Sequence, residues 1–207
     1  MSNELEKLVS IGNRKVGKTT AIFNLTSATD CPMKNQCEFG ITGKCYALKS
    51  ERLYPQVLPY RRRQQAYWES KEIPELTKDF VEYFKKHPSL KYLRFNESGD
   101  ATTYWDFMKM HYITVALMMA DMNVHVYTYT HNVDAYDDFV IRWGEPCDRL
   151  HVNISTVDYL PYKVNRFLGT SLIPADAEFV CKGKGCGTDC TLCSRPIDGK
   201  TVYCRLH

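Results

Sequence analysis

The sequence predicts an α/β fold in which parallel βα repeats form a partial-barrel-like sheet, followed by a cysteine-rich, metal-binding appendage. Segments rich in β-branched and aromatic residues alternate with segments of helical periodicity, which is the pattern of βαβ units and parallel sheets. From Cys181 onward this pattern stops, and Cys, Gly and Lys dominate. We therefore expect an α/β core over residues 1–180 and a metal-binding tail over residues 181–207, folded around something other than a hydrophobic core.

Length and composition limit the class of protein. The 207 residues suit one domain with a small appendage, and 44% hydrophobic with 25% charged residues is typical of a packed globular chain. The net charge of +3 does not by itself favour nucleic acid. The longest apolar run, residues 113–120, is too short to cross a bilayer, and the N-terminus lacks the apolar stretch of a secretory signal. We expect no membrane partner and a cytoplasmic location.

The first βα unit is interrupted by a long loop. Residues 21–26 are predicted to form a strand because β-branched and aromatic residues dominate there. A loop rich in Cys, Gly and Pro follows over residues 30–46, then a helix-permissive stretch over residues 47–71. The next segment, residues 74–86, has helical periodicity, and Pro74 suits its first turn.

The following units are more regular. Residues 91–95 are predicted to form a strand that runs into a polar turn over residues 96–100, and a long helix begins near residue 102. Further strands are predicted over residues 124–130 and 150–156. One stripe of the long helix is apolar at steps of three and four, and we expect it to face the core: Trp105, Met108, Tyr112, Val115 and Met119.

Residues 12–19 match the phosphate-loop pattern G-x4-G-K-T letter for letter. That pattern binds phosphate only between a buried strand and a helix. The residues that follow it favour a strand instead, so we expect no nucleotide-binding loop here.

Three cysteines, Cys31, Cys37 and Cys45, lie in the loop after the first strand. The chain has nine cysteines, and an odd number in a reducing compartment favours metal ligation over disulfides. Three thiolates on a cubane cluster leave one iron open to a small molecule, whereas a structural site normally uses four ligands. A fourth ligand from Cys147 or a histidine, and unligated thiols, remain alternatives.

The tail carries four cysteines within thirteen residues: Cys181, Cys186, Cys190 and Cys193. Their glycine-bearing spacers allow the backbone to wrap one metal centre. Zinc and a [4Fe-4S] cluster both fit this spacing, as a structural staple or as a redox or substrate-facing centre. The roles of Cys204 and His207 stay open.

The predicted turn at Asn96, Glu97, Ser98, Gly99 and Asp100 should lie at the same carboxyl edge of the sheet as the cysteine loop. Its carboxylates and backbone carbonyls suit an amino group or ribose hydroxyls. The alternative is that Asp100 or Thr102 caps the next helix.

Two further groups are candidates for binding. Arg61, Arg62 and Arg63 lie near aromatic residues in a helix-permissive stretch, which suits phosphate and base binding or a solvated face. In the strand over residues 124–130, alternation places His125, Tyr127, Tyr129 and His131 on one face, which either contacts substrate or packs in the core.

Four signatures span most of the chain: Cys45-Tyr46-Ala47, the RFNESGD run, the Tyr127-Thr128-Tyr129-Thr130 strand end and the cysteine-rich tail. On these the chain resembles the phage-encoded gene product eighty-eight family. The order of parts is also similar to that of radical S-adenosylmethionine (SAM) enzymes. That resemblance implies that Cys31, Cys37 and Cys45 hold the reducing cluster and that Glu97 to Asp100 meet the methionine end of SAM, with Tyr46 and Asn96 beside them.

We therefore expect a phage iron-sulfur protein, with an enzyme favoured, that binds one or two [4Fe-4S] clusters and SAM in the host cytoplasm. The alternative is a zinc-stapled phage protein that binds nucleic acid through Arg61 to Arg63, or a host protein, without catalysis. The substrate and the oligomeric state do not follow from the sequence.

Overall fold

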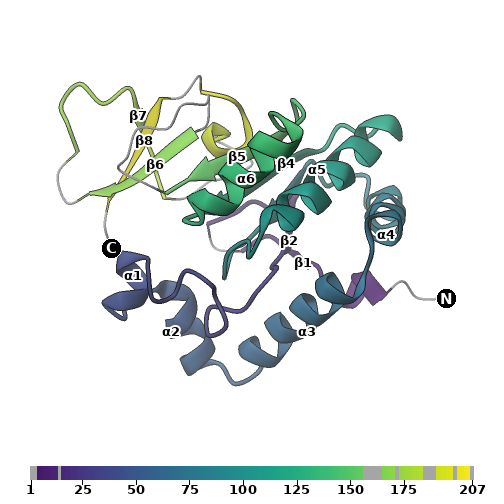
Figure 1. The fold of residues 1–207 in the computed structure, drawn as a ribbon, viewed down its shortest axis with the longest axis horizontal. Coiled ribbons are helices and arrows are strands. Elements are labelled where there is room, and N and C mark those ends of the chain that lie inside the picture. The colour runs from purple at the N-terminus through teal and green to yellow at the C-terminus, as the bar shows by residue number, and fades with distance from the viewer. Residues whose placement is uncertain are drawn as a thin grey trace.

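One mostly parallel sheet organises the chain in the computed structural model, which describes residues 4–13, 15–155, 165–170, 173–183, 190–197 and 200–205. Its eight strands run in the order β1-β2-β3-β4-β5-β6-β8-β7 (Figure 1). Among the described strands, only β1 pairs antiparallel, with β2. The strands are β1 (Ser10–Ile11), β2 (Thr20–Phe23), β3 (Tyr92–Phe95), β4 (His125–Thr130), β5 (Leu150–Ile154), β6 (Asn165–Thr170), β7 (Phe179–Val180) and β8 (Thr201–Arg205). The α/β class with a parallel sheet is confirmed.

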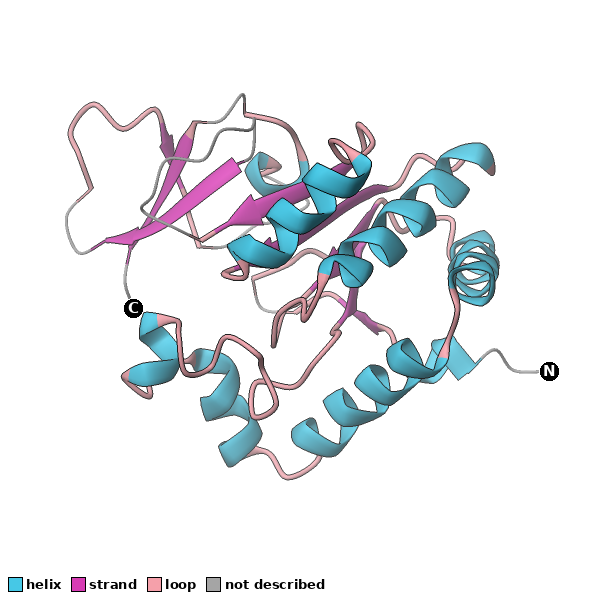
Figure 2. Cartoon of the chain, viewed as in Figure 1, coloured by secondary structure: helices cyan, strands magenta, loops and turns pink. Residues whose placement is uncertain are grey.

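The α-helices of the described chain all belong to the connections between β2 and β5, and they lie beside the sheet (Figure 2). The long β2–β3 connection holds α1 (Glu38–Ile41), α2 (Tyr46–Leu53), α3 (Val57–Ser70) and α4 (Ile73–Lys86). Single helices, α5 (Tyr104–Met119) and α6 (Val133–Trp143), connect β3 to β4 and β4 to β5. The described part of the chain also contains two 3₁₀ helices, η1 (Glu4–Lys7) and η2 (Leu192–Ser194). Residues 47–71 form two helices because Pro55 forces Tyr54 into an extended conformation.

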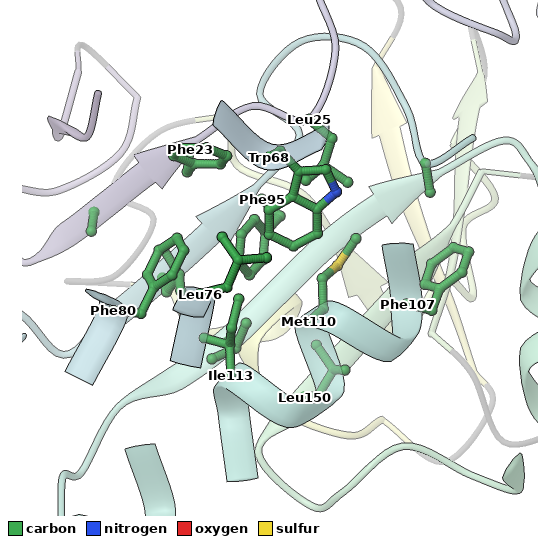
Figure 3. Packing of buried hydrophobic residues seen from close by; sticks show 14 of the residues in the cluster. Phe23, Leu25, Trp68, Leu76, Phe80, Phe95, Phe107, Met110, Ile113 and Leu150 are labelled. Carbon is green, nitrogen blue, oxygen red and sulfur yellow. The ribbon is translucent and has the colours of Figure 1, made fainter. Parts of the chain in front are cut away.

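Helices α3 to α6 pack on one face of the sheet through a cluster rich in aromatic residues (Figure 3). Phe23 of β2 and Phe95 of β3 are fully buried there. The ring centroid of Phe23 lies 5.7 Å from that of Phe80 on α4, and that of Phe95 lies 5.6 Å from Trp68 on α3. Leu76 and Ile113 fill the space around these rings in the same cluster. This face is the main core of the protein.

A second, smaller apolar cluster lies on the opposite face of the sheet. It joins Tyr127 of β4 and Phe167 of β6 to three residues of the tail, Cys193, Ile197 and Val202. Strand β8 of the tail also lies between β6 and β7 in the same sheet. The expectation that the tail lacks a hydrophobic core is therefore wrong, because its apolar residues pack against the sheet.

The apolar stripe predicted to face the core on α5 is wrong at three of its five positions, whereas Met108 is buried as predicted and Val115 is partly buried. Trp105, Tyr112 and Met119 are exposed by 49%, 37% and 84%. The buried face consists instead of Phe107, Met108, Met110, Ile113, Thr114 and Leu117. Apolar side chains surround most of this helix, so its spacing offers more than one apolar stripe. Packing against α4, α6 and β5 decides which one is buried.

The phosphate-loop pattern at residues 12–19 connects β1 to β2 as a hairpin. The backbone N–H of Gly12 donates to the carbonyl of Thr20 at 2.9 Å. A strand, not a helix, follows the pattern. The pattern therefore lacks the strand-to-helix setting in which it binds phosphate, and the prediction that a strand follows it is confirmed.

Candidate functional site

The loops that follow β2 and β3 lie together at the carboxyl edge of the sheet. Phe23 and Phe95 are register partners, so Asn24 and Asn96 begin the two loops side by side. Asn24 Oδ1 accepts from the backbone N–H of Ser98 at 2.8 Å, and Asn96 Oδ1 accepts from that of Leu25 at 3.3 Å. These paired amides lock the turn over residues 96–100 to the start of the cysteine-bearing loop.

Gly99 allows the closest approach between the two loops. Its φ is +71°, and a Cβ on it would lie 2.0 Å from Thr26 Oγ1. The Thr26 hydroxyl accepts from the backbone N–H of Asp100 at 3.0 Å. Asn96 also has a positive φ, 57°, which asparagine tolerates better than most residues. The backbone of this turn therefore favours a glycine at position 99 and an asparagine at position 96.

Asp100 holds the end of β4. Its buried carboxylate accepts from Thr130 Oγ1 at 2.6 Å and from the backbone N–H of His131 at 2.7 Å. Burial raises the pKa of Asp100 to about 6, although these hydrogen bonds act to lower it. The expected alternative, that Asp100 or Thr102 caps α5, is wrong because Thr103 is the N-cap and forms a capping box with Asp106.

The residues predicted to bind a cofactor differ in their accessibility. Asn96, Ser98 and Asp100 are buried, whereas Glu97 and Gly99 are partly exposed. The Tyr46 hydroxyl donates to the carbonyl of Glu97, and Asn13 Nδ2 donates to the Glu97 carboxylate. The structure thus brings Tyr46, directly after the third cysteine, to the turn. A ligand at this edge would meet Tyr46 and Glu97, while the buried members shape the turn.

The three loop cysteines are partly exposed free thiols. Burial raises the pKa of Cys31 to about 12, and the charges of Asp100, Cys37 and Cys45 raise it further. Cys37 caps α1, since its Sγ accepts from the backbone N–H of Gly40 at 3.3 Å.

Glu51 of α2 connects the cysteine loop to the two helices that follow it. The buried carboxylate accepts from the backbone N–H groups of Ala28 at 2.7 Å and Thr29 at 2.9 Å. Arg61 Nη1 donates to the same carboxylate at 2.9 Å and to the carbonyl of Ala47 at 3.1 Å. Burial acts to raise the pKa of Glu51, but its hydrogen bonds to Thr29, Arg61 and Ala28 outweigh burial and lower the pKa.

The arginine run supports this loop as well. Arg62 forms a two-pronged pair with Asp30, at 2.7 and 2.9 Å, one residue before Cys31. Arg63 is exposed, and its Cζ lies 5.8 Å from the ring centroid of Tyr60. Two of the three arginines proposed from the sequence to bind nucleic acid thus have intramolecular partners.

Sequence reasoning missed Glu51 as a site-forming residue. Its partners come from positions 22, 23 and 10 residues away, and no local spacing links them. A usable signal was the presence of a carboxylate within an otherwise apolar helical face beside Ala47 and Leu48, which are both buried. A buried carboxylate requires a partner of opposite charge.

The tail cysteines are only partly described. Cys193 is buried in the second cluster, Cys181 packs against that cluster, and Cys190 is partly exposed. Cys186 and His207 lie outside the described residues. Within the described ranges, no group of three or more His, Cys, Asp or Glu side chains is arranged to hold a metal ion. The metal-binding appendage is therefore not shown, and metal binding by either cysteine group stays a prediction.

Comparison with known proteins identifies the family. The family model described as Gene product 88 matches residues 3–159, which include the cysteine loop, Glu51 and the turn over residues 96–100, but not the tail. No curated protein and no solved structure matches the chain. No helix in the described part of the chain is long and apolar enough to cross a membrane. The chain belongs to the Gene product 88 family, a family of phage proteins.

Proposed function

We propose that the protein is an iron-sulfur enzyme of the radical SAM kind. Cys31, Cys37 and Cys45 would bind a [4Fe-4S] cluster through three thiolates, and SAM would bind at its open iron. The observation that supports this proposal is the meeting of the cysteine loop with the turn over residues 96–100 at the carboxyl edge of a parallel sheet. Ligand sites in α/β sheets lie at this edge.

The donor set fits such a cluster in its chemistry. Three free thiols share one loop, and the nearby carboxylate of Asp100 adds to the charge that opposes ionisation of Cys31. A bound metal centre would favour the thiolate form of Cys31 instead, because metal ligation deprotonates a thiol. When bound, the cluster supplies the electron for reductive cleavage of SAM.

The protein's own residues would position the two ligands. Glu51 and Asp30, held by Arg61 and Arg62, fix the backbone of residues 28–30 just before the first cysteine. Tyr46 and Glu97 would contact SAM, since both are accessible at the turn. Asn96, Ser98, Gly99 and Asp100 would hold the turn in shape beneath it.

The sheet order supports a partial-barrel arrangement as part of this proposal. The strands β2 to β6 follow one another both in the chain and in the sheet, all parallel. Right-handed connections then place the intervening helices on one face. Cys181, Cys186, Cys190 and Cys193 would hold a second cluster or a zinc ion. Free thiols are typical of a reducing compartment, which fits the host cytoplasm.

The test is anaerobic purification, metal analysis and reconstitution with iron and sulfide, followed by incubation with SAM and a reductant. We expect brown protein that converts SAM to 5′-deoxyadenosine. Cys37→Ala should lose this activity and part of the iron, whereas the control Cys147→Ala, whose thiol packs against the helix-facing core, should keep both. Colourless protein that contains zinc and leaves SAM intact would contradict the proposal and favour a zinc-stapled binding protein, which a salt-dependent RNA or DNA titration would then examine.

A further inference from the structure

Arg94 lies in the middle of β3 on the sheet face opposite the helices. Its neighbours in the strand, Leu93 and Phe95, are fully buried in the helix-facing core, so alternation directs Arg94 to the other side. Arg94 is the register partner of Tyr127 on β4. Its Cζ lies 5.3 Å from the ring centroid of Tyr129, which places the guanidinium group over that ring.

The guanidinium group of Arg94 has no ion-pair partner among the described residues. No described carboxylate lies within 4.0 Å of it, no hydrogen bond from it to a described acceptor is formed, and its Nε is buried without a partner. Arg61, by contrast, has the Glu51 carboxylate at 2.9 Å. A guanidinium group has five N–H donors, and the Nε–H of the partly exposed Arg94 is buried unpaired, which costs free energy.

The groups that face Arg94 are mostly neutral. Burial acts to lower its pKa, while the tyrosines at 46, 127 and 129 and the carboxylate of Glu97 raise it. That carboxylate already accepts from Asn13 Nδ2. The Glu97 carboxylate therefore acts on Arg94 only from beyond ion-pair distance. The N–H groups of Arg94 remain available for another acceptor.

Other polar atoms on this face also lack partners. Thr20 Oγ1, His125 Nδ1 and His151 Nε2 are buried and make no hydrogen bond within the described parts of the chain. Strand alternation puts all three on the same face as Arg94, and the rings of His125 and His151 stack with centroids 6.0 Å apart. Each of these buried groups has lost its hydrogen bonds to water without gaining a partner, which costs free energy. A ligand or ordered water on this face would remove that cost.

We propose that Arg94 binds the oxyanion of a small-molecule ligand on this face of the sheet, a carboxylate or a phosphate group. The planar fork of arginine matches either anion through two parallel hydrogen bonds. The ring of Tyr129 supports the guanidinium plane and leaves its N–H edge for the anion. This inference does not depend on the iron-sulfur proposal, because its residues need no metal.

The test uses the arginine-selective reagent phenylglyoxal on the unaltered protein, with inorganic phosphate or acetate added at constant ionic strength. Arg142 is the internal control, because it also packs on an aromatic ring, Tyr104 at 4.9 Å, but is exposed. We expect one of the anions to slow modification of Arg94 in a saturable way, about tenfold at ten times its dissociation constant. The modification rate of Arg142 should not change. The more effective anion identifies the group as phosphate or carboxylate.

Equal rates for Arg94 with and without either anion would overturn the proposal, as would equal protection of Arg94 and Arg142. A second measurement follows the melting temperature. The effective anion should raise it in the unaltered protein and in Arg142→Met but not in Arg94→Met, while Arg94→Lys, which keeps the charge and loses the fork, should show a reduced rise. A rise of the same size in all four proteins would also overturn the proposal.

Discussion

The two faces of the sheet differ in how completely their side chains are partnered. On the helix-facing side, Phe23, Phe80 and Phe95 are fully buried among other apolar rings. On the opposite side, Arg94, His125 and His151 carry buried polar atoms that lack a partner among the described residues. Buried polar groups are normally hydrogen-bonded, and proteins that depart from this rule usually do so at functional sites. The first face forms the main core, and the second is the face on which we propose that Arg94 binds a ligand.

The largest expected effect is on the helix-facing side. Phe95→Ala should lower the free energy of unfolding by about 3–5 kcal/mol, because it leaves a cavity among Phe23, Trp68 and Phe80. Urea denaturation measures this loss. The control is Tyr92→Ala on the same strand, whose partly exposed ring lies on the other face and should cost less. Equal losses would remove the distinction between the faces.

Two arginines, the buried Arg61 and the partly exposed Arg94, sharpen the comparison. Arg61→Met should destabilise the protein by about 3–5 kcal/mol, because it leaves the Glu51 carboxylate buried without its cation. Arg94→Met should change the free energy of unfolding by less than about 1 kcal/mol, because no ion pair is broken. The same denaturation series measures both. A large loss for Arg94→Met would show that Arg94 supports the fold and not a ligand.

Acid should destabilise the protein through His151, which lies on the sheet face opposite the helices. Burial, helped by the charge of His125, lowers the pKa of His151 to about 4. Between this value and the unfolded pKa of about 6.5 the unfolded chain binds more protons, so stability is complete above pH 6.5 and is lost as the pH falls to 4. The loss from His151 should be roughly 3 kcal/mol at pH 4.

The measurement is the free energy of unfolding at pH 7 and pH 4 for the unaltered protein and for His151→Gln, which cannot titrate. The variant should lose less stability on acidification. An identical loss in the two proteins would mean that His151 is not buried in its neutral form.

A smaller effect is expected at the carboxyl edge of the sheet. Gly99→Ala and Gly43→Ala impose the same backbone strain, because φ is +71° and +68° at the two positions. Only at Gly99 does the new Cβ meet another group, Thr26, so this variant should lose about 1–3 kcal/mol more. Thermal or urea unfolding of the matched pair measures the difference. Equal losses would mean that the two loops are not held in close contact.

The sequence predicts the framework of this fold well, because β-rich and amphipathic segments alternate clearly. Strands β3, β4 and β5 lie within the predicted ranges. A strand follows the phosphate-loop pattern, as its flanking residues predicted. The buried face of α5 does not follow from spacing, because that helix is apolar on several sides and only tertiary packing selects one.

The site is predictable in its placement but less so in its internal roles. Following two strands to their carboxyl ends brings the cysteine loop and the turn at residues 96–100 together, as the hydrogen bond between Asn24 and Ser98 shows. The structural use of Asp100 by β4, and that of Glu51 by the loop at Ala28, depend on contacts between distant segments. Arg94 has a readable signal, since a charged residue between Leu93 and Phe95 must face away from the core.

The most direct test of the proposed function is electron paramagnetic resonance of the reconstituted, reduced protein before and after SAM is added. We predict the signal of a reduced [4Fe-4S] cluster, a change in that signal when SAM binds, and loss of the SAM-dependent change in Cys37→Ala. A signal that SAM leaves unchanged, or one that responds to SAM equally in Cys37→Ala, would contradict the assignment of the open cluster to Cys31, Cys37 and Cys45.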